Sequence, residues 1–255
     1  MVSIETRKLT FAYARENVLE GLDLRFDPGT LTAVLGPNGS GKSTLIKCID
    51  GILPVDSKSI LVGDRDLASF SGNERAQLMG YVPQQENAVF STTVYETILM
   101  GRKPYIGWAP GKTDYEIVNR VIGDLDLGDI SHRYLNELSG GQRQRAIIGR
   151  ALAQEPAVLL LDEPTANLDL KHQLEVMQIL QQLAKNKMNV VIAIHDLNLA
   201  AMFCNHFIML QRGKLFAEGD SSVITVENIR QLYGVEAGVI TENNRKTVIP
   251  VKPVK

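Results

Sequence analysis

Three short apolar runs recur along the chain, each without the polar alternation of a half-exposed strand. They are Thr30–Leu35, Ala157–Leu161 and Val190–Ile194. Strands covered on both faces lose their alternation, so these runs predict buried, largely parallel strands. Between the last two runs lies an apolar stripe at helical spacing, made of Leu170, Leu174, Met177, Leu180 and Leu183. Strands that alternate with an amphipathic crossover helix predict an α/β domain with a mostly parallel sheet.

Two further parts of the chain depart from this rhythm. Leu9–Tyr13 and Leu22–Phe26 predict short strands joined by turns, and Ser59–Val62 completes an N-terminal antiparallel β subdomain. Residues from about 85 to 140 are mainly helical in pattern, which predicts an inserted α-helical subdomain. Near the end, Val248–Val251 is a candidate terminal strand.

The composition is that of an ordinary globular protein, with 44% hydrophobic and 22% charged residues among 255. A net charge of −2 argues against a nucleic-acid partner. No apolar run approaches the ~20 residues needed to cross a bilayer, and the first residues lack a secretory h-region. Cys48 and Cys204 are too few for a disulfide framework or a zinc site. We therefore expect a cytosolic protein with buried thiols.

The segment Gly36–Ser43 reads Gly-Pro-Asn-Gly-Ser-Gly-Lys-Ser and matches the nucleotide P-loop, after a strand and before a helix. Glycines let backbone N–H groups converge on phosphate oxygens, and the helix N-terminus adds a favourable dipole. Lys42 supplies a positive charge, and the Ser43 hydroxyl can ligate Mg²⁺. A glycine turn that merely links strand and helix is the alternative, which this context disfavours. The nucleotide-binding candidates are Gly36, Pro37, Asn38, Gly39, Ser40, Gly41, Lys42, Ser43 and Thr44.

Two acidic residues and a histidine follow the other buried runs. Asp162 and Glu163 come directly after one strand, and His195 follows the next. Ligands of open α/β sheets bind at the carboxyl ends of strands. Asp162 is placed to hold Mg²⁺, and Glu163 to orient and deprotonate a water as general base. His195 would lie over the same crevice, in hydrogen-bonding reach of phosphate or water. Alone, each could be a solvated strand end or a packing residue.

Leu138-Ser139-Gly140-Gly141-Gln142 gives a further candidate site. Ser139 and Gln142 have the spacing of a capping box that opens a helix from Arg143 to Ala153, so a well-capped helix is the simplest interpretation. The functional interpretation is a second anion site at a helix N-terminus, formed by Ser139, Gly140, Gly141 and Gln142. The string resembles the signature of the ATP-binding-cassette (ABC) family, and with the P-loop and Asp162-Glu163 the chain is identified as a member.

The resemblance covers about residues 4 to 236 and implies further roles. Tyr13 is similar to the aromatic residue that stacks on adenine. Gln84 is similar to the Q-loop glutamine that touches Mg²⁺ or water, with Gln85 as an alternative. Asp169, in Asn167-Leu168-Asp169, matches the D-loop, although the family more often has alanine at position 167 and a glycine near Lys58. His195 matches the switch histidine. His132, His172 and His206 are assigned no chemistry.

The resemblance implies an ATPase that needs ATP and Mg²⁺, with residues 1–236 as the nucleotide-binding domain and 237–255 as a short extension. One copy each of P-loop and signature implies a homodimer with composite sites. The stretch from Met100 to Trp108 resembles motor subunits of importers for iron–siderophore complexes, haem and cobalamin. Molybdate, zinc and manganese importers stay open. The implied partners are two integral-membrane permease subunits at the inner face of the cell membrane and, indirectly, a substrate-binding protein, with no nucleic acid.

Two other classes compete with the importer. One is a soluble ABC ATPase that acts in translation, DNA repair or iron–sulfur assembly; such proteins usually carry two cassettes or a long coiled-coil insert, and neither is in this sequence. The other is an exporter motor separated from its membrane half, which a free-standing chain disfavours. Co-purification with a polytopic membrane protein would separate these classes from the importer.

Overall fold

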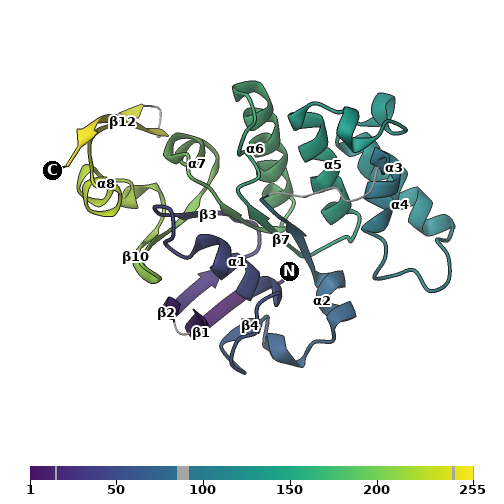
Figure 1. Ribbon diagram of the computed structural model, residues 1–255, viewed down its shortest axis with the longest axis horizontal. Helices are drawn as coiled ribbons and strands as arrows, with labels where there is room; N and C mark the ends of the chain where they lie inside the picture. The colour runs from purple at the N-terminus through teal and green to yellow at the C-terminus, as the bar shows by residue number, and fades with distance from the viewer. Residues whose placement is uncertain (15, 85–91, 243–244, 255) are drawn as a thin grey trace.

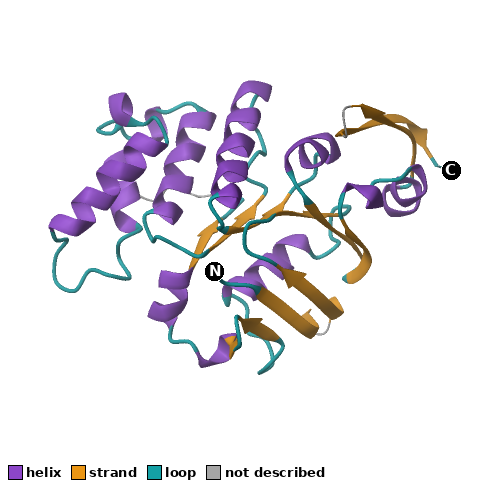
Figure 2. Cartoon of the chain, turned by 180° about the vertical axis from the view of Figure 1, so that it is seen from behind, coloured by secondary structure: helices purple, strands orange, loops and turns teal. Residues whose placement is uncertain are grey.

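The structure is a computed structural model that describes residues 1–14, 16–84, 92–242 and 245–254. A twisted sheet crosses the middle of the molecule, helices cover it above, and a smaller sheet lies below together with the helices labelled α1 and α2 (Figure 1). A group of helices extends to one side, and the C-terminal hairpin lies at the other (Figures 1 and 2). Apart from Tyr13, which ends a strand of the smaller sheet, the functional residues predicted from sequence lie at strand ends, turns and helix starts around the central sheet.

The central sheet has six strands in the order β10-β9-β3-β8-β7-β6. Its members are β3 (Leu31–Leu35), β6 (Met79–Val82), β7 (Val158–Asp162), β8 (Asn189–Ala193), β9 (His206–Gln211) and β10 (Lys214–Gly219). All neighbours pair in parallel except β9 with β10. The three apolar runs correspond to β3, β7 and β8, so the prediction of a mostly parallel sheet is confirmed.

Successive residues of these strands enter different cores, which explains the missing polar alternation. In β7, Leu159 and Leu161 pack in the core formed with the helices on one face. Val158 and Leu160 pack in the core shared with α1 and the N-terminal sheet on the other face. The helices around the sheet are α1 (Lys42–Asp50), α5 (Gly140–Leu152), α6 (Leu170–Lys185), α7 (Leu197–Phe203) and α8 (Val226–Tyr233).

The predicted crossover helix is α6, with one correction to its buried stripe. Val176, Met177 and Leu180 are fully buried against the sheet. Leu170 is instead 68% exposed. It is the first residue of the helix, next to the capping Asp169, where the helix has not yet met the sheet. The helical period was therefore right, but the stripe begins a turn later than predicted.

The N-terminal subdomain is a four-stranded sheet in the order β2-β1-β4-β5. Its strands are β1 (Ile4–Tyr13), β2 (Glu16–Phe26), β4 (Ile60–Val62) and β5 (Arg65–Asp66). All pairings are antiparallel, as predicted. The first two strands are longer than the short strands expected, because backbone pairing continues through polar positions that face solvent. A short 3-10 turn (Leu67–Ser69) and α2 (Gly72–Leu78) lead back to the central sheet.

The inserted helical subdomain has a separate core. It contains α3 (Val94–Met100), α4 (Lys112–Asp124) and two 3-10 turns (Gly128–Ile130 and Leu135–Glu137) before α5 begins. Val94, Ile98, Val118 and Leu127 are fully buried in this core. The helical prediction is confirmed for this stretch. Residues 85–91, the start of the predicted insertion, lie outside the described residues.

A third, two-stranded sheet closes the chain. After a 3-10 turn (Ser221–Val223) and α8, β11 (Val235–Glu242) pairs with β12 (Arg245–Pro253). The candidate terminal strand is thus confirmed as part of β12. Asn198 of α7 holds this hairpin by bonding both the amide and the carbonyl of Val248, at 2.7 and 3.1 Å.

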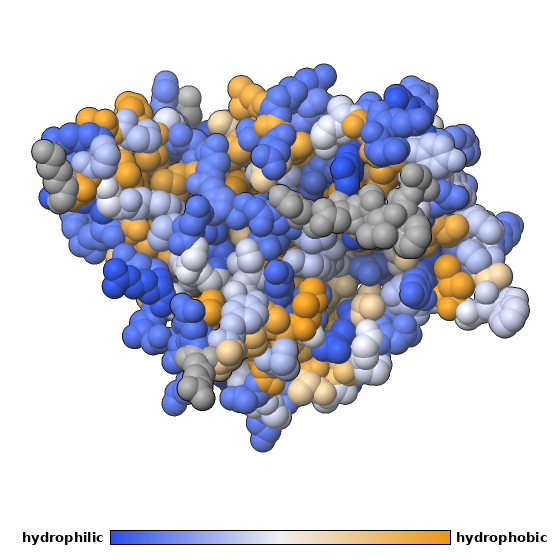
Figure 3. Space-filling model, viewed as in Figure 1, coloured by the Kyte–Doolittle hydropathy of each residue, from blue (hydrophilic) through white to orange (hydrophobic). Residues whose placement is uncertain are grey.

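The surface shows no large apolar area on the face seen in Figure 3, where orange residues are scattered among blue ones. Within the described part of the chain, no helix combines the length and apolar character that a membrane span requires.

Candidate functional site

The P-loop joins β3 to α1, and its glycines are required by both conformation and space. Gly36 and Gly41 have φ of 149° and 102°. A Cβ on Gly36 would lie 2.3 Å from the carbonyl oxygen of Leu210, and one on Gly41 would lie 2.7 Å from the side chain of Leu19. Gly41 caps α1 without any side-chain bond to the first turn. Helix-start N–H groups left without a capping side chain form an anion-binding site.

Lys42 is held inside this loop. Its ammonium donates to the carbonyl oxygens of Gly36 and Pro37 at 2.8 and 3.0 Å. The residue is 5% exposed. Burial lowers the pKa of Lys42, while the carboxylates of Glu163 and Asp162 oppose that shift. The positive charge is thus fixed at the centre of the cradle before any phosphate is bound, which reduces the entropy lost on binding.

Asp162 ends β7 and faces the P-loop helix. The hydroxyl of Ser43 donates to its carboxylate at 2.7 Å. Asp162 is 2% exposed. Burial raises the pKa of Asp162, and the Ser43 bond and Lys47 and Lys42 partly offset the shift. A hydroxyl and a carboxylate side by side are hard oxygen ligands of the kind Mg²⁺ prefers, so these two residues fit the metal role predicted for them.

Glu163 lies one residue further and is held by two other strand ends. Gln84, after β6, donates its side-chain amide to one Glu163 oxygen at 2.7 Å. His195, after β8, contacts the other oxygen through Nε2. Glu163 has φ of 50°, in the left-handed region. Strained backbone of this kind persists where the surrounding structure over-determines it, commonly at functional sites.

The three residues converge because β6, β7 and β8 are parallel neighbours, so their carboxyl ends share one edge of the sheet. Gln84, Glu163 and His195 line a pocket of about 440 Å³ together with P-loop residues. The full lining is Val18, Asn38, Gly39, Ser40, Gly41, Lys42, Ser43, Thr44, Gln84, Glu163 and His195. Gln85, the alternative Q-loop residue, lies outside the described residues.

The sequence did not point to Val18, which lies in β2. No motif marks this position, and its contact with the P-loop depends on the packing of the N-terminal sheet against α1. Its carbonyl would lie 3.0 Å from a Cβ on Gly41. Val18 therefore brings a residue of the N-terminal sheet into the pocket lining.

Other predicted residues lie outside the pocket lining. Tyr13, the candidate adenine platform, ends β1, is 48% exposed and meets Phe11 edge-on, with 4.9 Å between ring centroids. Ser139 and Gln142 form the predicted capping box at the start of α5. Asp169 caps α6. None of these four lines the pocket described above.

Two departures from the family pattern fall on left-handed backbone. Lys58 has φ of 66° and Asn167 has φ of 60°. Glycine adopts this region without penalty, which explains why a glycine is common near Lys58. Asparagine is among the residues that tolerate it best, so Asn167 suits its turn better than alanine would.

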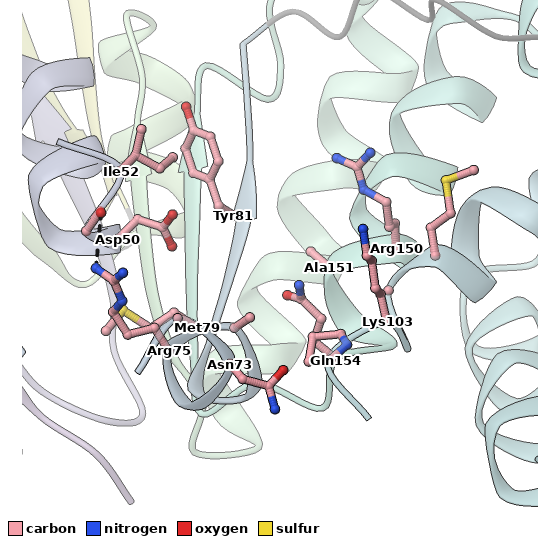
Figure 4. A pocket seen from close by; sticks show the side chains of 16 residues that line it. Asp50, Ile52, Asn73, Arg75, Met79, Tyr81, Lys103, Arg150, Ala151 and Gln154 are labelled. Carbon is pink, nitrogen blue, oxygen red and sulfur yellow. Dashed lines mark hydrogen bonds between the residues drawn. The ribbon is translucent and has the colours of Figure 1, made fainter. Parts of the chain in front are cut away.

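A larger hollow, of about 710 Å³, lies between the central sheet and the helical subdomain. Figure 4 shows Asp50, Arg75 and Tyr81 on one side of it, and Lys103 and Arg150 on the other. Arg75 donates to the carbonyl of Gly51 at 3.1 Å. Here we call this hollow the intersubdomain groove. It lies apart from the P-loop, because it lines the C-terminal end of α1 whereas the P-loop lies at its N-terminal end.

The stretch from Met100 to Trp108 borders this groove, and part of it has a structural role. A Cβ on Gly101 would lie 2.0 Å from the carbonyl oxygen of Arg150. Arg102 is 4% exposed and pairs with Asp114 at 3.0 Å. In contrast, Lys103 lines the groove, and Trp108 is completely exposed.

Comparisons with known proteins show the family to which the chain belongs. The family model described as "ABC transporter" matches residues 19–166. An uncharacterized ABC transporter ATP-binding protein of Methanocaldococcus jannaschii is 44% identical over 94% of this chain and 95% of its own length. The hemin import ATP-binding protein HmuV of Rhodopseudomonas palustris is 35% identical, covering 93% of this chain and 92% of the relative.

Solved structures share the fold. A chain from a metal-chelate type ABC transporter in an inward-facing conformation superposes with a TM-score of 0.85 at 30% identity. The match covers 100% of this chain and 99% of that chain. The P-loop, the paired carboxylates and the histidine therefore occur in the fold to which such motifs belong. This chain is a member of the ABC transporter family, an ATP-binding subunit that hydrolyses ATP.

Proposed function

We propose that the chain energises an importer of metal chelates, with iron–siderophore complexes, haem and cobalamin as the candidate cargoes. The relatives named for hemin import and for iron(3+)-hydroxamate import support this class. The observation that supports ATP hydrolysis at this site is the position of Glu163. Its carboxylate is held beside the P-loop by Gln84 and His195.

In this proposal each group of residues has its own role in phosphate binding, metal binding or proton transfer. The P-loop amides and Lys42 bind the β- and γ-phosphates. Ser43, Asp162 and Gln84 would hold Mg²⁺, and the ion would supply positive charge that offsets the negative charge of the phosphates. Glu163 accepts a proton from the attacking water as general base. His195 and Gln84 orient its two oxygens, and His195 also lines the pocket beside the P-loop.

The signature and Asp169 require a second chain. Because Ser139, Gln142 and Asp169 do not line the pocket of their own chain, they are available to a partner's nucleotide. We therefore infer a homodimer that closes on ATP, with Ser139 and the N–H groups at the start of α5 on the phosphates. Tyr13 would stack on adenine from its exposed position at the end of β1.

The intersubdomain groove is the proposed contact for the permease subunits. It connects to the P-loop through α1, whose two ends lie at the two sites. Two ATPase subunits would thus carry two integral-membrane subunits at the inner face of the membrane, with a substrate-binding protein acting through them. The alternative, an ABC ATPase of translation, DNA repair or iron–sulfur assembly, would leave this groove without a membrane partner.

The test is co-purification of the tagged chain from detergent-solubilised membranes. We expect a polytopic membrane protein to be recovered with it. Lys103→Glu reverses a charge in the groove and should reduce that recovery while ATP binding is unchanged. Lys112→Glu is the matched control, because Lys112 is 91% exposed and does not line the groove. Recovery only with ribosomes, or without any membrane protein, would refute the importer.

The cargo is tested by reconstituting the recovered complex in vesicles. ATP-dependent uptake is measured with a panel of ferric siderophores, haem, cobalamin and molybdate. Uptake of one iron or cobalt chelate is the expected result. Uptake of molybdate alone would show that the chelate class is wrong while leaving the importer intact.

A further inference from the structure

The imidazole of His172 occupies the space that a side chain on Gly141 would need. A Cβ built on Gly141 would lie 2.0, 2.3 and 2.7 Å from Cδ2, Cγ and Cβ of His172. Two of these atoms belong to the root of the side chain, so a rotation of the ring does not remove the overlap. The second glycine of the signature is thus explained by packing: the ring of a residue in α6 lies directly on the backbone at the start of α5.

The same imidazole is tied to the D-loop. Its Nδ1 lies 2.6 Å from the carboxylate of Asp169. The signature turn and the D-loop also touch at a second place. A Cβ on Gly140 would lie 3.3 Å from the side chain of Leu168. One side chain therefore touches both loops that a single chain would present to a partner.

Helix capping by itself does not account for this side chain. The cap of α6 consists of the Asp169 carboxylate accepting the backbone N–H of His172 at 2.9 Å. Any residue other than proline supplies that N–H. The ring bond and the ring contact with Gly141 are additional, and they connect two different helices.

A second contact holds the same pair of helices one turn further on. Arg145 of α5 pairs with Glu175 of α6 at 3.2 Å, with side chains 17% and 29% exposed. Contacts at two successive turns therefore fix the start of α5 relative to the start of α6.

We propose that His172 is a positioning residue that sets the distance and orientation of the signature turn relative to Asp169 within one chain. The inference rests on the proposed homodimer, in which both loops meet the partner subunit's nucleotide. Both loops must then match the same nucleotide at once. A fixed spacing between them reduces the ordering that closure would otherwise require.

The variants at position 172 separate the two contacts of the ring. Asparagine places a planar amide at Cγ with an N–H donor in the position of Nδ1, so His172→Asn keeps both contacts. His172→Leu keeps the bulk but loses the donor, and His172→Ala loses both. Lys171→Ala is the matched control on the same turn, because the Lys171 side chain is 80% exposed and its ammonium lies as far as 3.9 Å from Glu175.

The readout is ATP-induced dimer formation in a Glu163→Gln background, followed by size-exclusion chromatography across ATP concentrations. We expect His172→Ala to raise the half-saturating ATP concentration about tenfold, because it loses the hydrogen bond to Asp169 together with the ring contact on Gly141. His172→Leu should give a smaller shift, and His172→Asn and Lys171→Ala should stay near the parent. Binding of ATP to the monomer and the thermal unfolding midpoint should be unchanged, which excludes a folding defect.

Gly141→Ala supplies an independent check of the contact. Alone it should severely impair dimer formation, because the methyl group and the ring compete for one space. Added to His172→Ala it should cause a smaller loss than it does alone, since Cδ2 and Cγ of the ring are gone and only the Cβ contact at 2.7 Å remains.

Each outcome decides a different claim. Parent-like dimer formation by His172→Ala, or a loss in His172→Asn equal to that in His172→Ala, would overturn the positioning role. Equal effects of Gly141→Ala with and without His172 would overturn the steric contact on which the inference depends. If Glu163→Gln itself stayed monomeric at saturating ATP, the homodimer would be wrong and this inference would fall with it.

Discussion

The hydroxyl of Ser43 donates a 2.7 Å hydrogen bond to the carboxylate of Asp162, although 119 positions separate them in the sequence. This bond joins the start of α1 to the end of β7, and it brings together the two residues proposed as oxygen ligands of Mg²⁺. Ser43→Ala removes one of them. We expect ATP binding in the presence of Mg²⁺ to weaken about tenfold, while binding in EDTA changes little.

Isothermal titration with and without Mg²⁺ measures this difference. Ser69→Ala, an exposed serine in the N-terminal part, is the control. An equal loss in both conditions would mean that Ser43 acts on the P-loop conformation rather than on the metal.

Lys42→Ala should weaken nucleotide binding by about tenfold to a hundredfold. The ammonium is already positioned by the carbonyls of Gly36 and Pro37, so its charge-assisted bonds to phosphate lose little entropy. Fluorescence titration with a labelled ATP analogue checks this, with Lys112→Ala as control. Unaltered affinity in a variant with an unchanged unfolding midpoint would contradict the phosphate role.

Glu163→Gln should retain ATP binding and lower turnover about 10²- to 10⁴-fold, the range for removal of a general base. Gln84→Ala and His195→Ala should each lower turnover as well. Because Gln84 and His195 hold the two oxygens of the same carboxylate, their effects should be strongly non-additive in the Glu163→Gln background. Steady-state phosphate release measures the turnover of each single and double variant. Additive losses would show that the three residues act independently.

The carboxyl of Asp50 should make the free energy of unfolding depend on pH. Burial raises the pKa of this carboxyl to about 6, with Arg75 opposing the shift. Since the folded pKa lies above the unfolded value of 3.8, the charged form destabilises the fold, and stability is lost as the pH rises through about 6. Asp50→Asn stays neutral. It should raise the free energy of unfolding by about 2 kcal/mol at pH 8 and by less at pH 5.

Urea unfolding at the two pH values tests this. Asp64→Asn, at an exposed position, serves as the control. A gain of the same size at both pH values would argue against ionisation of Asp50 as the cause.

Arg102 stabilises the helical subdomain through buried polar contacts. Its guanidinium bonds Asp114, Glu155 and the carbonyl of Ala153. Arg102→Ala should lower the free energy of unfolding by about 3 kcal/mol, because the buried carboxylate of Asp114 loses its counter-ion. Urea unfolding checks this against Lys103→Ala, which should be near neutral. A loss below about 0.5 kcal/mol, the range of ordinary surface substitutions, would show that the pair is not structurally important.

Much of the fold could be predicted from local pattern. Strands such as Leu159–Leu161 are apolar at successive positions because both faces of the sheet are covered, and this is visible without coordinates. The P-loop was equally predictable, because its glycines are required by backbone geometry within one turn. Leu170 shows the limit of the pattern: helical periodicity gives the face of α6, but only the position of the sheet decides where burial begins.

The sequence alone determined the chemistry of this protein: a phosphate cradle with Lys42, a carboxylate pair at a strand end, and a signature helix start. These depend on short-range geometry, which neighbouring residues specify. Only the tertiary structure decided which groups meet. The contact of Glu163 with Gln84 and His195 depends on the order of parallel strands, and the packing of His172 on Gly141 depends on how two helices cross. Such contacts join positions far apart in the chain, so no local pattern encodes them.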